Sequence, residues 1–306
     1  MVSMLQRITA LLGALIVLAG LNGRNACAQM QPLLGENTTR ISDHVWAMMG
    51  FPNVAIVVGE RASLVVDTGL GLRNGATVAR VAAKLSANRK LFLTTTHFHP
   101  EHAAGEGGFP PDTILIRDAV QQQEMERHGM EMVEMFSSRS AQNKELLAGV
   151  KLRSPDVVFN TEAAIDLGGT VTARLLWFGG AHTKGDELIL VEPDGTLVSG
   201  DVVQNKVVPN IFGDGGTPSS WIAVLDRISA LPVQHVLPDH SAPGDGSLVA
   251  RERAFIVDLR ARARDLKQRG VTADDAGQRL SVEFKAKYPD WPNMNVTGFV
   301  RSIYAE

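Results

Sequence analysis

The residues with the clearest chemical potential form one short segment, residues 97–102, which reads HFHPEH. Three of the 8 histidines of the chain lie in this segment, together with one carboxylate. Imidazole nitrogens and carboxylate oxygens are typical ligands of zinc and similar ions. Residues two apart in an extended segment point to the same side, so His97 and His99 can contact one ion. Glu101 and His102 follow the bend and can face a second ion. The segment therefore predicts a metal site rather than a chance cluster on a solvated loop.

Other metal-binding side chains follow predicted strands elsewhere in the chain. These residues are His182 after the strand 171–178, Asp201 after the strand 197–200 and His240 after the strand 233–237. The segment 97–102 also follows a predicted strand, the apolar run at 91–95. Functional sites are commonly built from loops at one end of a sheet scaffold. We therefore expect these separate strand ends to contribute ligands to one site.

The first residues, 1–28, have the pattern of a secretory signal peptide. Arg7 precedes an apolar run at 8–21, and the segment closes with an A-x-A sequence at 26–28. The apolar run is too short to span a membrane comfortably. We expect cleavage, a periplasmic or secreted protein, and no stable membrane anchor. One alternative is an uncleaved membrane anchor. Another is a lipid attached at Cys27, although the residues just before Cys27 lack the apolar position that lipoprotein signals usually carry.

The remaining residues, 29–306, are predicted to form a single domain. The net charge of the chain is only -3, which gives no indication of a nucleic-acid partner. Cys27 is the one cysteine and would leave with the signal peptide. A metal site in the mature chain must therefore use His, Asp and Glu. We expect a small-molecule substrate, and the sequence leaves the oligomeric state open.

Predicted strands and helices follow each other in two similar halves. Short apolar, β-branched runs dominate 41–66 and 157–200, and helical spacing follows each of them. This order predicts an α/β fold with a two-sheet core covered by helices on both sides. The predicted helix within 118–148 carries four methionines between residues 125 and 135. They could form an adaptable wall over an apolar substrate, but an ordinary packed helix is the favoured interpretation.

These motifs together resemble the metallo-β-lactamase superfamily. The matching segments are H-x-H-x-E-H at 97–102, G-A-H-T-x-G-D at 180–186, S-G-D at 199–201, P-D-H at 238–240 and D-T-G at 67–69. The resemblance extends from about residue 41 to residue 240. It implies a four-layer αβ/βα sandwich, with two mainly antiparallel sheets flanked by helices, and a dinuclear site, usually of zinc, at one edge.

The resemblance also implies how the ligands are shared between two ions. The first ion would be held by His97, His99 and His182, the second by Glu101, His102 and His240, and Asp201 would bridge them. Two such ions can share a hydroxide and polarise a carbonyl or phosphoryl oxygen, so no protein nucleophile is needed. Glu101 and Asp201 are the expected catalytic residues. Ligating imidazoles need partners on their other nitrogen, and Asp67 and Asp186 are the candidates.

Two positions depart from the family pattern. Glu101 stands where the family usually has Asp, and its extra methylene moves the carboxylate oxygens by about an ångström. Such a displacement can cost about a hundredfold in rate. Either the local loop compensates, or the second site is weak and one ion does the work. Asp239 precedes His240 where the family often has glycine, and it either orients His240 or faces solvent.

The expected function is an exported, metal-dependent hydrolase with one or two Zn²⁺ ions, or alternatively iron or manganese. A metal-bound hydroxide would attack the carbonyl of a lactone, ester, thioester or β-lactam. The superfamily name does not identify which of these is the substrate. Two alternatives stay open: a mononuclear iron oxidoreductase of the persulfide-dioxygenase type, and a non-catalytic periplasmic metal-binding protein.

The other histidines are expected to be structural. They are His44, His128 and His235. Lys184 and Asn205 lie near the expected groove and are candidates for substrate contacts.

Overall fold

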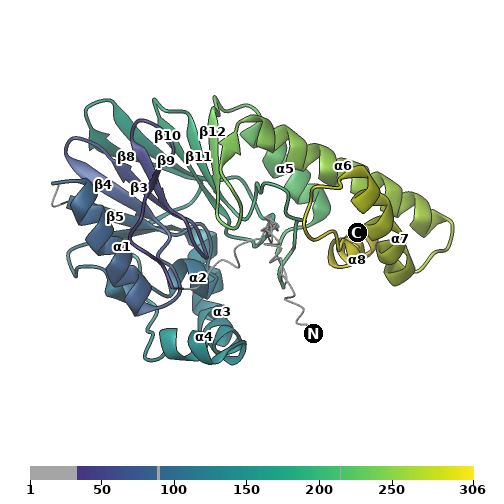
Figure 1. Ribbon diagram of the computed structural model, residues 1–306, viewed down its shortest axis with the longest axis horizontal. Helices are drawn as coiled ribbons and strands as arrows, with labels where there is room; N and C mark the ends of the chain where they lie inside the picture. The colour runs from purple at the N-terminus through teal and green to yellow at the C-terminus, as the bar shows by residue number, and fades with distance from the viewer. Residues whose placement is uncertain (1–32, 88–89, 214) are drawn as a thin grey trace, which may run out of the picture.

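The computed structural model describes residues 33–87, 90–213 and 215–306. The predicted signal peptide at 1–28 lies outside the described residues. Two sheets face each other, and helices cover their outer sides (Figure 1). This arrangement confirms the predicted α/β sandwich. Within the described ranges, no helix is both long enough and apolar enough to cross a membrane.

The first sheet has seven strands in the order of the chain. They are β1 (Thr39–Arg40), β2 (Val45–Met48), β3 (Val54–Val58), β4 (Ala62–Val66), β5 (Lys90–Thr94), β6 (Ile114–Asp118) and β7 (Val157–Phe159). Strands β1 to β4 form an antiparallel meander. From β4 to β7 the pairing is parallel. The carboxyl ends of β4 and β5 therefore lie at the same edge of the sheet.

The second sheet has six strands in the order β13-β12-β11-β10-β9-β8. They are β8 (Glu162–Gly168), β9 (Val171–Trp177), β10 (Glu187–Glu192), β11 (Thr196–Gly200), β12 (His235–Pro238) and β13 (Gly244–Asp245). Strands β11 and β12 pair in parallel, while β9, β10 and β11 alternate in direction. Strands β9, β11 and β12 consequently end at one edge. Both sheets are mixed, and their shared edge collects the strand ends that the sequence singles out.

Helices complete the outer layers. They are α1 (Leu72–Leu85), α2 (Pro100–Ala103), α3 (Ala119–Ser138), α4 (Ala141–Leu146), α5 (Pro218–Ile228), α6 (Ser247–Gln268), α7 (Ala273–Lys287) and α8 (Thr297–Ala305), with a 3₁₀ turn η1 at Glu106–Gly108. The stretch 118–148 contains two helices, because α3 ends before Ser140, whose side chain caps α4. Met125 and Met132 are buried in the packing of α3, as the packed-helix interpretation expects, while Met130 is exposed.

The strands are apolar on both faces because both faces are covered. Along β4, Leu64 and Val66 contribute to the core between the sheets, while Val65 points outward against α1. Alternate residues of a strand point to opposite faces, so one apolar run serves two core layers. The buried strands therefore read as continuous hydrophobic segments rather than as alternating ones.

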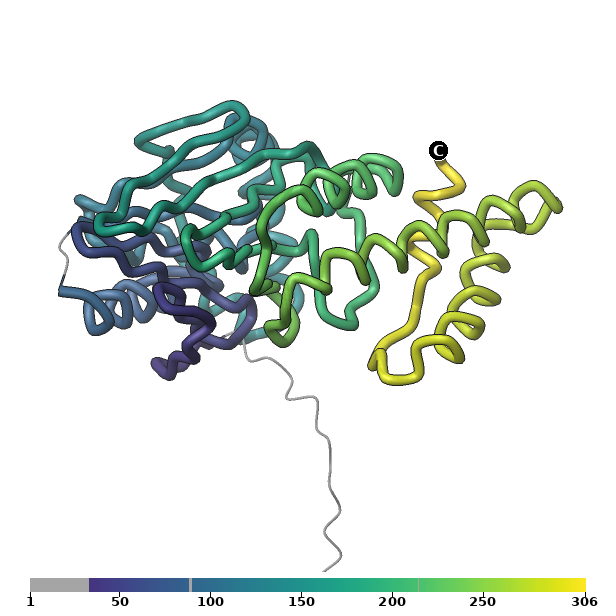
Figure 2. The backbone as a smooth tube through the Cα atoms, turned by 90° about the horizontal axis from the view of Figure 1, so that it is seen from above, coloured from purple at the N-terminus to yellow at the C-terminus, as the bar shows by residue number. Residues whose placement is uncertain are grey.

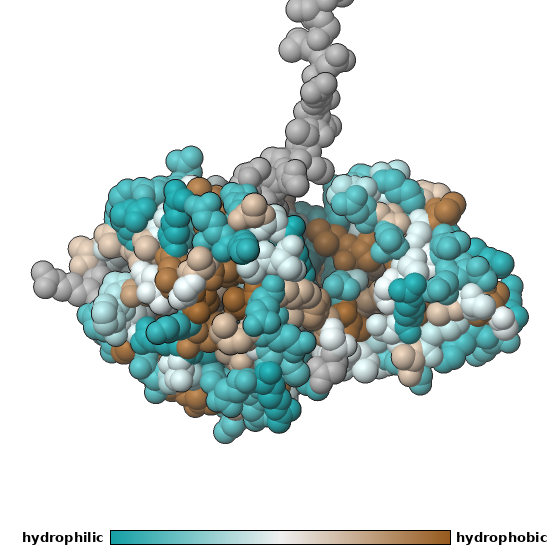
Figure 3. Space-filling model, turned by 90° about the horizontal axis from the view of Figure 1, so that it is seen from below, coloured by the Kyte–Doolittle hydropathy of each residue, from teal (hydrophilic) through white to brown (hydrophobic). Residues whose placement is uncertain are grey.

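The C-terminal helices extend the molecule beyond the sandwich. Helix α6 projects outward, and α7 and α8 return alongside it (Figure 2). These helices share one apolar cluster with α5 and the second sheet, in which Phe255 stacks on Trp291 at 4.5 Å. Figure 3 shows a hollow between these helices and the sandwich, flanked by hydrophobic surface. A cavity of about 250 Å³ lies there, between Lys206, Leu248 and Trp291.

Candidate metal centre

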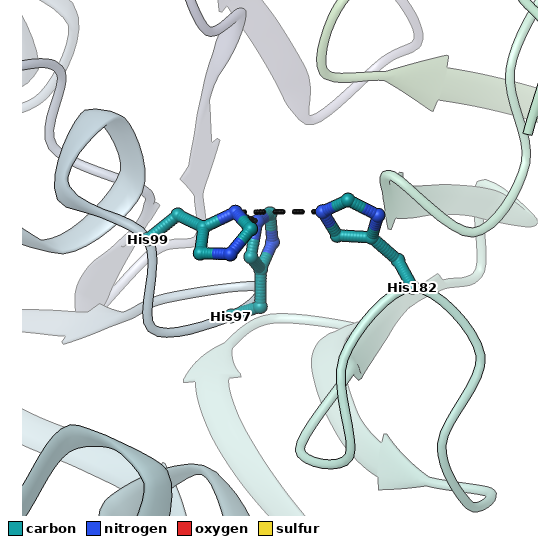
Figure 4. A group of neighbouring side chains, drawn as sticks. All are labelled: His97, His99 and His182. Atoms are coloured by element: carbon teal, nitrogen blue, oxygen red, sulfur yellow. Dashed lines mark hydrogen bonds between the residues drawn. The ribbon is translucent and has the colours of Figure 1, made fainter. Parts of the chain in front are cut away.

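Three histidines converge at the edge of the sandwich. Nδ1 of His99 lies 3.0 Å from Nε2 of His97 and 3.4 Å from Nε2 of His182 (Figure 4). All three side chains are buried, which excludes a solvated loop. We call these residues the first ligand group. Three nitrogens that face one point, without a carboxylate between them, can hold a divalent ion.

Local structure explains how the segment 97–102 reaches this position. Strand β5 ends at Thr94, and Pro100 begins α2, where its missing N–H is tolerated at the first helical position. His99 is the residue before this helix and makes no capping hydrogen bond with its side chain. Its imidazole is therefore available to the site. The helical turn then places Glu101 and His102 next to the first group, and the ring centroids of His97 and His102 are 4.0 Å apart.

The second ligand group consists of Glu101, His102 and His240. Their candidate ligand atoms all lie within 4.8 Å of one another. Oε1 of Glu101 is 4.0 Å from Nε2 of His102. The longer Glu side chain thus lies beside the other two residues of the second group.

Asp201 lies between the two groups. Its Oδ2 is 3.4 Å from Nε2 of His182, and its Oδ1 is 3.4 Å from Nε2 of His240. One oxygen thus faces each group, which is the placement expected of a bridging carboxylate. The structure therefore brings together all seven predicted ligands.

The donor set fits a divalent cation. Oε2 of Glu101 and Nε2 of His102 are buried and have no hydrogen-bond partner among the described residues. Buried polar atoms without partners are costly and uncommon, and a cation would satisfy both. A set of imidazoles and carboxylates suits zinc, iron or manganese.

The imidazole of His102 is fixed by two buried carboxylates. Its Nδ1 lies 3.1 Å from Oδ2 of Asp67 and 3.2 Å from Oδ2 of Asp239. Asp67 also accepts a hydrogen bond from the backbone N–H of Thr96 at 2.7 Å. Asp67 thus takes the orienting position expected of it. Asp239 takes neither of its two expected positions, because it is buried and contacts His102 rather than His240 or solvent.

Asp186 holds a loop rather than an imidazole. Its carboxylate accepts hydrogen bonds from the backbone N–H groups of Ala181 and Thr183 and from the hydroxyl of Thr183. Nδ1 of His182 instead contacts the carbonyl oxygen of Asn210. The expectation that Asp186 orients a ligating imidazole is therefore wrong. A backbone carbonyl takes that role, and no side-chain pattern in the sequence could indicate it.

The electrostatics of the two groups differ. Burial lowers the pKa of His97 and His99 well below the usual range, and neighbouring imidazoles lower it further. Burial also acts to lower the pKa of His102, but Asp67 and Asp239 raise it well above the usual range. Burial raises the pKa of Glu101 to about 7. His97 and His99 therefore offer neutral imidazoles at neutral pH, while Glu101 and His102 exchange protons for an ion.

Gln204 is a site residue that sequence reasoning missed. Its Nε2 donates to Oδ1 of Asp201 at 2.9 Å, and its Oε1 accepts from the hydroxyl of Ser241 at 2.7 Å. It thereby links the strand end of Asp201 with that of His240. Only the tertiary structure brings these partners together.

Aromatic rings surround His99. The ring centroids of Phe98 and Phe212 lie 5.0 Å and 4.6 Å from that of His99. These two phenylalanines also line a cavity of about 330 Å³, whose other lining side chains are Glu124, His128, Glu131 and Met132 of α3. The cavity thus has an apolar part next to His99 and an acidic part along α3.

The remaining histidines lie outside both ligand groups. His44 pairs with Asp194 and the exposed His128 contacts Glu131, and His235 begins β12. Of the expected groove residues, Asn205 donates through Nδ2 to the carbonyl of Ala242. The backbone N–H of Lys184 donates to Glu124, one of the residues that line the 330 Å³ cavity.

The chain belongs to the metallo-beta-lactamase superfamily, whose sequence pattern matches residues 48–240. The likeness to solved structures supports the same fold. A metallo-beta-lactamase from Pontibacter korlensis matches with a TM-score of 0.57 and 20% identity, covering 74% of this chain and 99% of that one. The sec-alkylsulfatase Pisa1 from Pseudomonas sp. matches with a TM-score of 0.66 and 14% identity, covering 88% of this chain and 49% of that one.

Two characterised relatives point to hydrolases within this superfamily. A linear primary-alkylsulfatase of Pseudomonas sp. (strain ATCC 19151) is 23% identical over 252 residues, which cover 72% of this chain and 48% of the relative. The acyl-coenzyme A thioesterase MBLAC2 of Homo sapiens is 25% identical over 227 residues, covering 68% of this chain and 79% of the relative. The chain spans about half the length of the alkylsulfatases that it matches. The histidine and carboxylate groups are consistent with a metal cofactor.

Proposed function

We propose that this protein is an exported, metal-dependent hydrolase that cleaves ester-type bonds, with thioesters and sulfate esters as the leading substrates. The observation that carries the proposal is the position of Asp201. Its two oxygens face the two ligand groups at 3.4 Å each. Two ions held by groups that share a carboxylate form a typical site for hydrolytic displacement.

The proposed cofactor is a pair of zinc ions, with iron and manganese as alternatives. When bound, such ions activate water and polarise the oxygen of the reacting group. The first ligand group and the second would each hold one ion, and Asp201 would contact both. Because burial keeps His97 and His99 neutral near neutral pH, these two ligands need no proton release to bind an ion.

Glu101 is proposed to hold the second ion and to orient the attacking water. Without an ion, burial raises the pKa of its carboxyl to about 7, so an ion that binds near neutral pH takes the place of a proton. Oε2 of Glu101 is buried and has no partner among the described residues, which leaves it available to that ion.

The choice of substrate rests on the relatives and on the cavity beside His99. One relative is an alkylsulfatase and another is an acyl-coenzyme A thioesterase. Phe98, Met132 and Phe212 line an apolar wall next to the first ligand group, and such a wall suits a hydrocarbon part of a small molecule. Export is proposed from residues 1–28 alone, and it places the enzyme in the periplasm or outside the cell.

A panel of ester-type substrates tests this function. Alkyl sulfates, acyl thioesters, aryl esters, lactones and a chromogenic β-lactam would be incubated with zinc-loaded protein. We expect hydrolysis of a thioester or a sulfate ester, loss of that activity with a chelator, and recovery when zinc is added back. His182→Ala serves as the inactive control. The proposal would be contradicted if none of these substrates were hydrolysed.

A further inference from the structure

An exposed arginine lies beside the first ligand group. Arg139 follows the last residue of α3 and precedes Ser140, the cap of α4. Its guanidinium carbon is 3.6 Å from the ring centroid of Phe136. The Phe136 ring is buried, and its centroid is 6.3 Å from that of His99. One aromatic ring therefore connects this cation with a predicted metal ligand.

The turn that carries Arg139 is held in place by its neighbours. Nδ2 of Asn143 donates to the carbonyl oxygen of Phe136 at 3.1 Å. The hydroxyl of Ser140 accepts from the backbone N–H of Asn143 at 3.0 Å. The backbone N–H of Arg139 also bonds the carbonyl of Phe136. A stacked side chain on a fixed turn loses little conformational freedom when it binds a ligand.

The guanidinium of Arg139 has unused hydrogen-bonding capacity. In the described ranges of the chain, its side chain stacks on Phe136 and makes no hydrogen bond or ion pair. Stacking occupies the face of the guanidinium and leaves its N–H groups free at the edge. These donors have the geometry that binds two oxygens of a carboxylate, sulfate or phosphate.

We propose that Arg139 binds an oxyanion group of the substrate, so that the enzyme selects molecules that carry a negatively charged carboxylate, sulfate or phosphate next to a hydrocarbon part. The hydrocarbon part would lie against Phe98, Met132 and Phe212, in the cavity of about 330 Å³ that Glu124 and Glu131 also line, so the anion itself would lie outside this cavity, at Arg139. That this ligand is the substrate rests on the proposed hydrolase function. The existence of an anion site at Arg139 does not depend on that function.

Binding without turnover tests this inference. Calorimetric titration of the zinc-loaded full-length protein would use hexanesulfonate, which has a tetrahedral anion, hexanoate, which has a planar one, and neutral hexanol. Arg139→Gln is compared with Arg139→Lys, which keeps the charge. Arg127→Gln is the matched control, because Arg127 is an exposed arginine of the same helix, α3.

We expect Arg139→Gln to weaken binding of at least one anion by about tenfold or more, as for a lost charge-assisted hydrogen bond. Hexanol binding should not change, Arg139→Lys should be intermediate, and Arg127→Gln should match the unsubstituted protein. Which anion responds identifies the oxyanion geometry. The inference is overturned if neither anion binds, or if Arg139→Gln changes the affinity for neither anion. It is also overturned if Arg139→Gln weakens the binding of hexanol as much as that of the anions. Anion binding that depends on Arg139 in a protein that hydrolyses nothing would refute the proposed function alone.

Discussion

The two ligand groups lie side by side but are built from different chemistry. The first consists of imidazoles alone, and its nitrogens lie 3.0 and 3.4 Å apart. The second combines Glu101 with two histidines, of which His102 rests on the buried carboxylates of Asp67 and Asp239. Placement by strand ends is enough for the first group. The second group depends on placement and also on the balance of buried charge.

The largest effect is expected from removing a ligand of the first group. His182→Ala should lose one ion per chain and at least about a hundredfold in hydrolytic activity, because an activating ion contributes several kcal/mol. Metal analysis and steady-state kinetics measure both effects. His44→Ala is the control, since His44 pairs with Asp194 outside the site. Full activity of His182→Ala would remove the first group from the mechanism.

Glu101→Asp tests whether the second group is tuned to the longer side chain. The Glu101 carboxylate lies 4.0 Å from Nε2 of His102. A side chain shorter by one methylene should therefore place the carboxylate oxygens too far from the second group. We expect a fall in kcat of about a hundredfold, the usual cost of an ångström of misplacement. The first ion should stay bound. A rise in activity would instead show that Glu101 weakens the site.

Asp67→Asn should affect the second group selectively. The substitution removes one of the two charges that hold Nδ1 of His102. Loss of such a supporting carboxylate costs about 10- to 100-fold in metal affinity. Zinc titration should show weaker binding of one ion only. The control is Asp166→Asn, because Asp166 forms an exposed ion pair with Arg61, and this substitution should leave the affinity for both ions unchanged. If the affinity for both ions fell equally, the distinction between the two ligand groups would be wrong.

The smallest effect is a difference in pH dependence. Burial raises the pKa of Glu101 to about 7, so the carboxyl gains a proton as the pH falls below that value. An ion must displace this proton, and affinity for the second ion should fall by up to about tenfold per pH unit below pH 7. The pKa of His97 and His99 lies well below the usual range, so the first ion should respond less. Parallel pH profiles for both ions would contradict this account.

The fold and the clustering of the candidate ligands could be predicted because both depend on local patterns. The apolar runs marked the strands, and each candidate ligand followed a strand end, as with Asp201 after β11 and His240 after β12. The partners of these residues could not be predicted in the same way. Asp239 contacts His102, Gln204 contacts Ser241 and the carbonyl of Asn210 contacts His182, and in each pair the residues are distant in sequence.

Two further features show the same limit. The break between α3 and α4 was missed because helical spacing continues across it, and the cap at Ser140 is a single residue. The sequence could not show where the Glu101 carboxylate lies, because its position depends on the backbone path as well as on the length of the side chain. The structure shows that the path through α2 places its carboxylate within reach of His102.

Metal content per chain tests the central claim most directly. Protein purified without chelators would be analysed for zinc, iron and manganese, alongside His240→Ala, which removes one ligand of the second group. A centre with two unlike groups predicts two zinc ions in the natural chain and one in His240→Ala, with the first group still occupied. A single iron in both proteins would contradict the account and favour oxidoreductase chemistry.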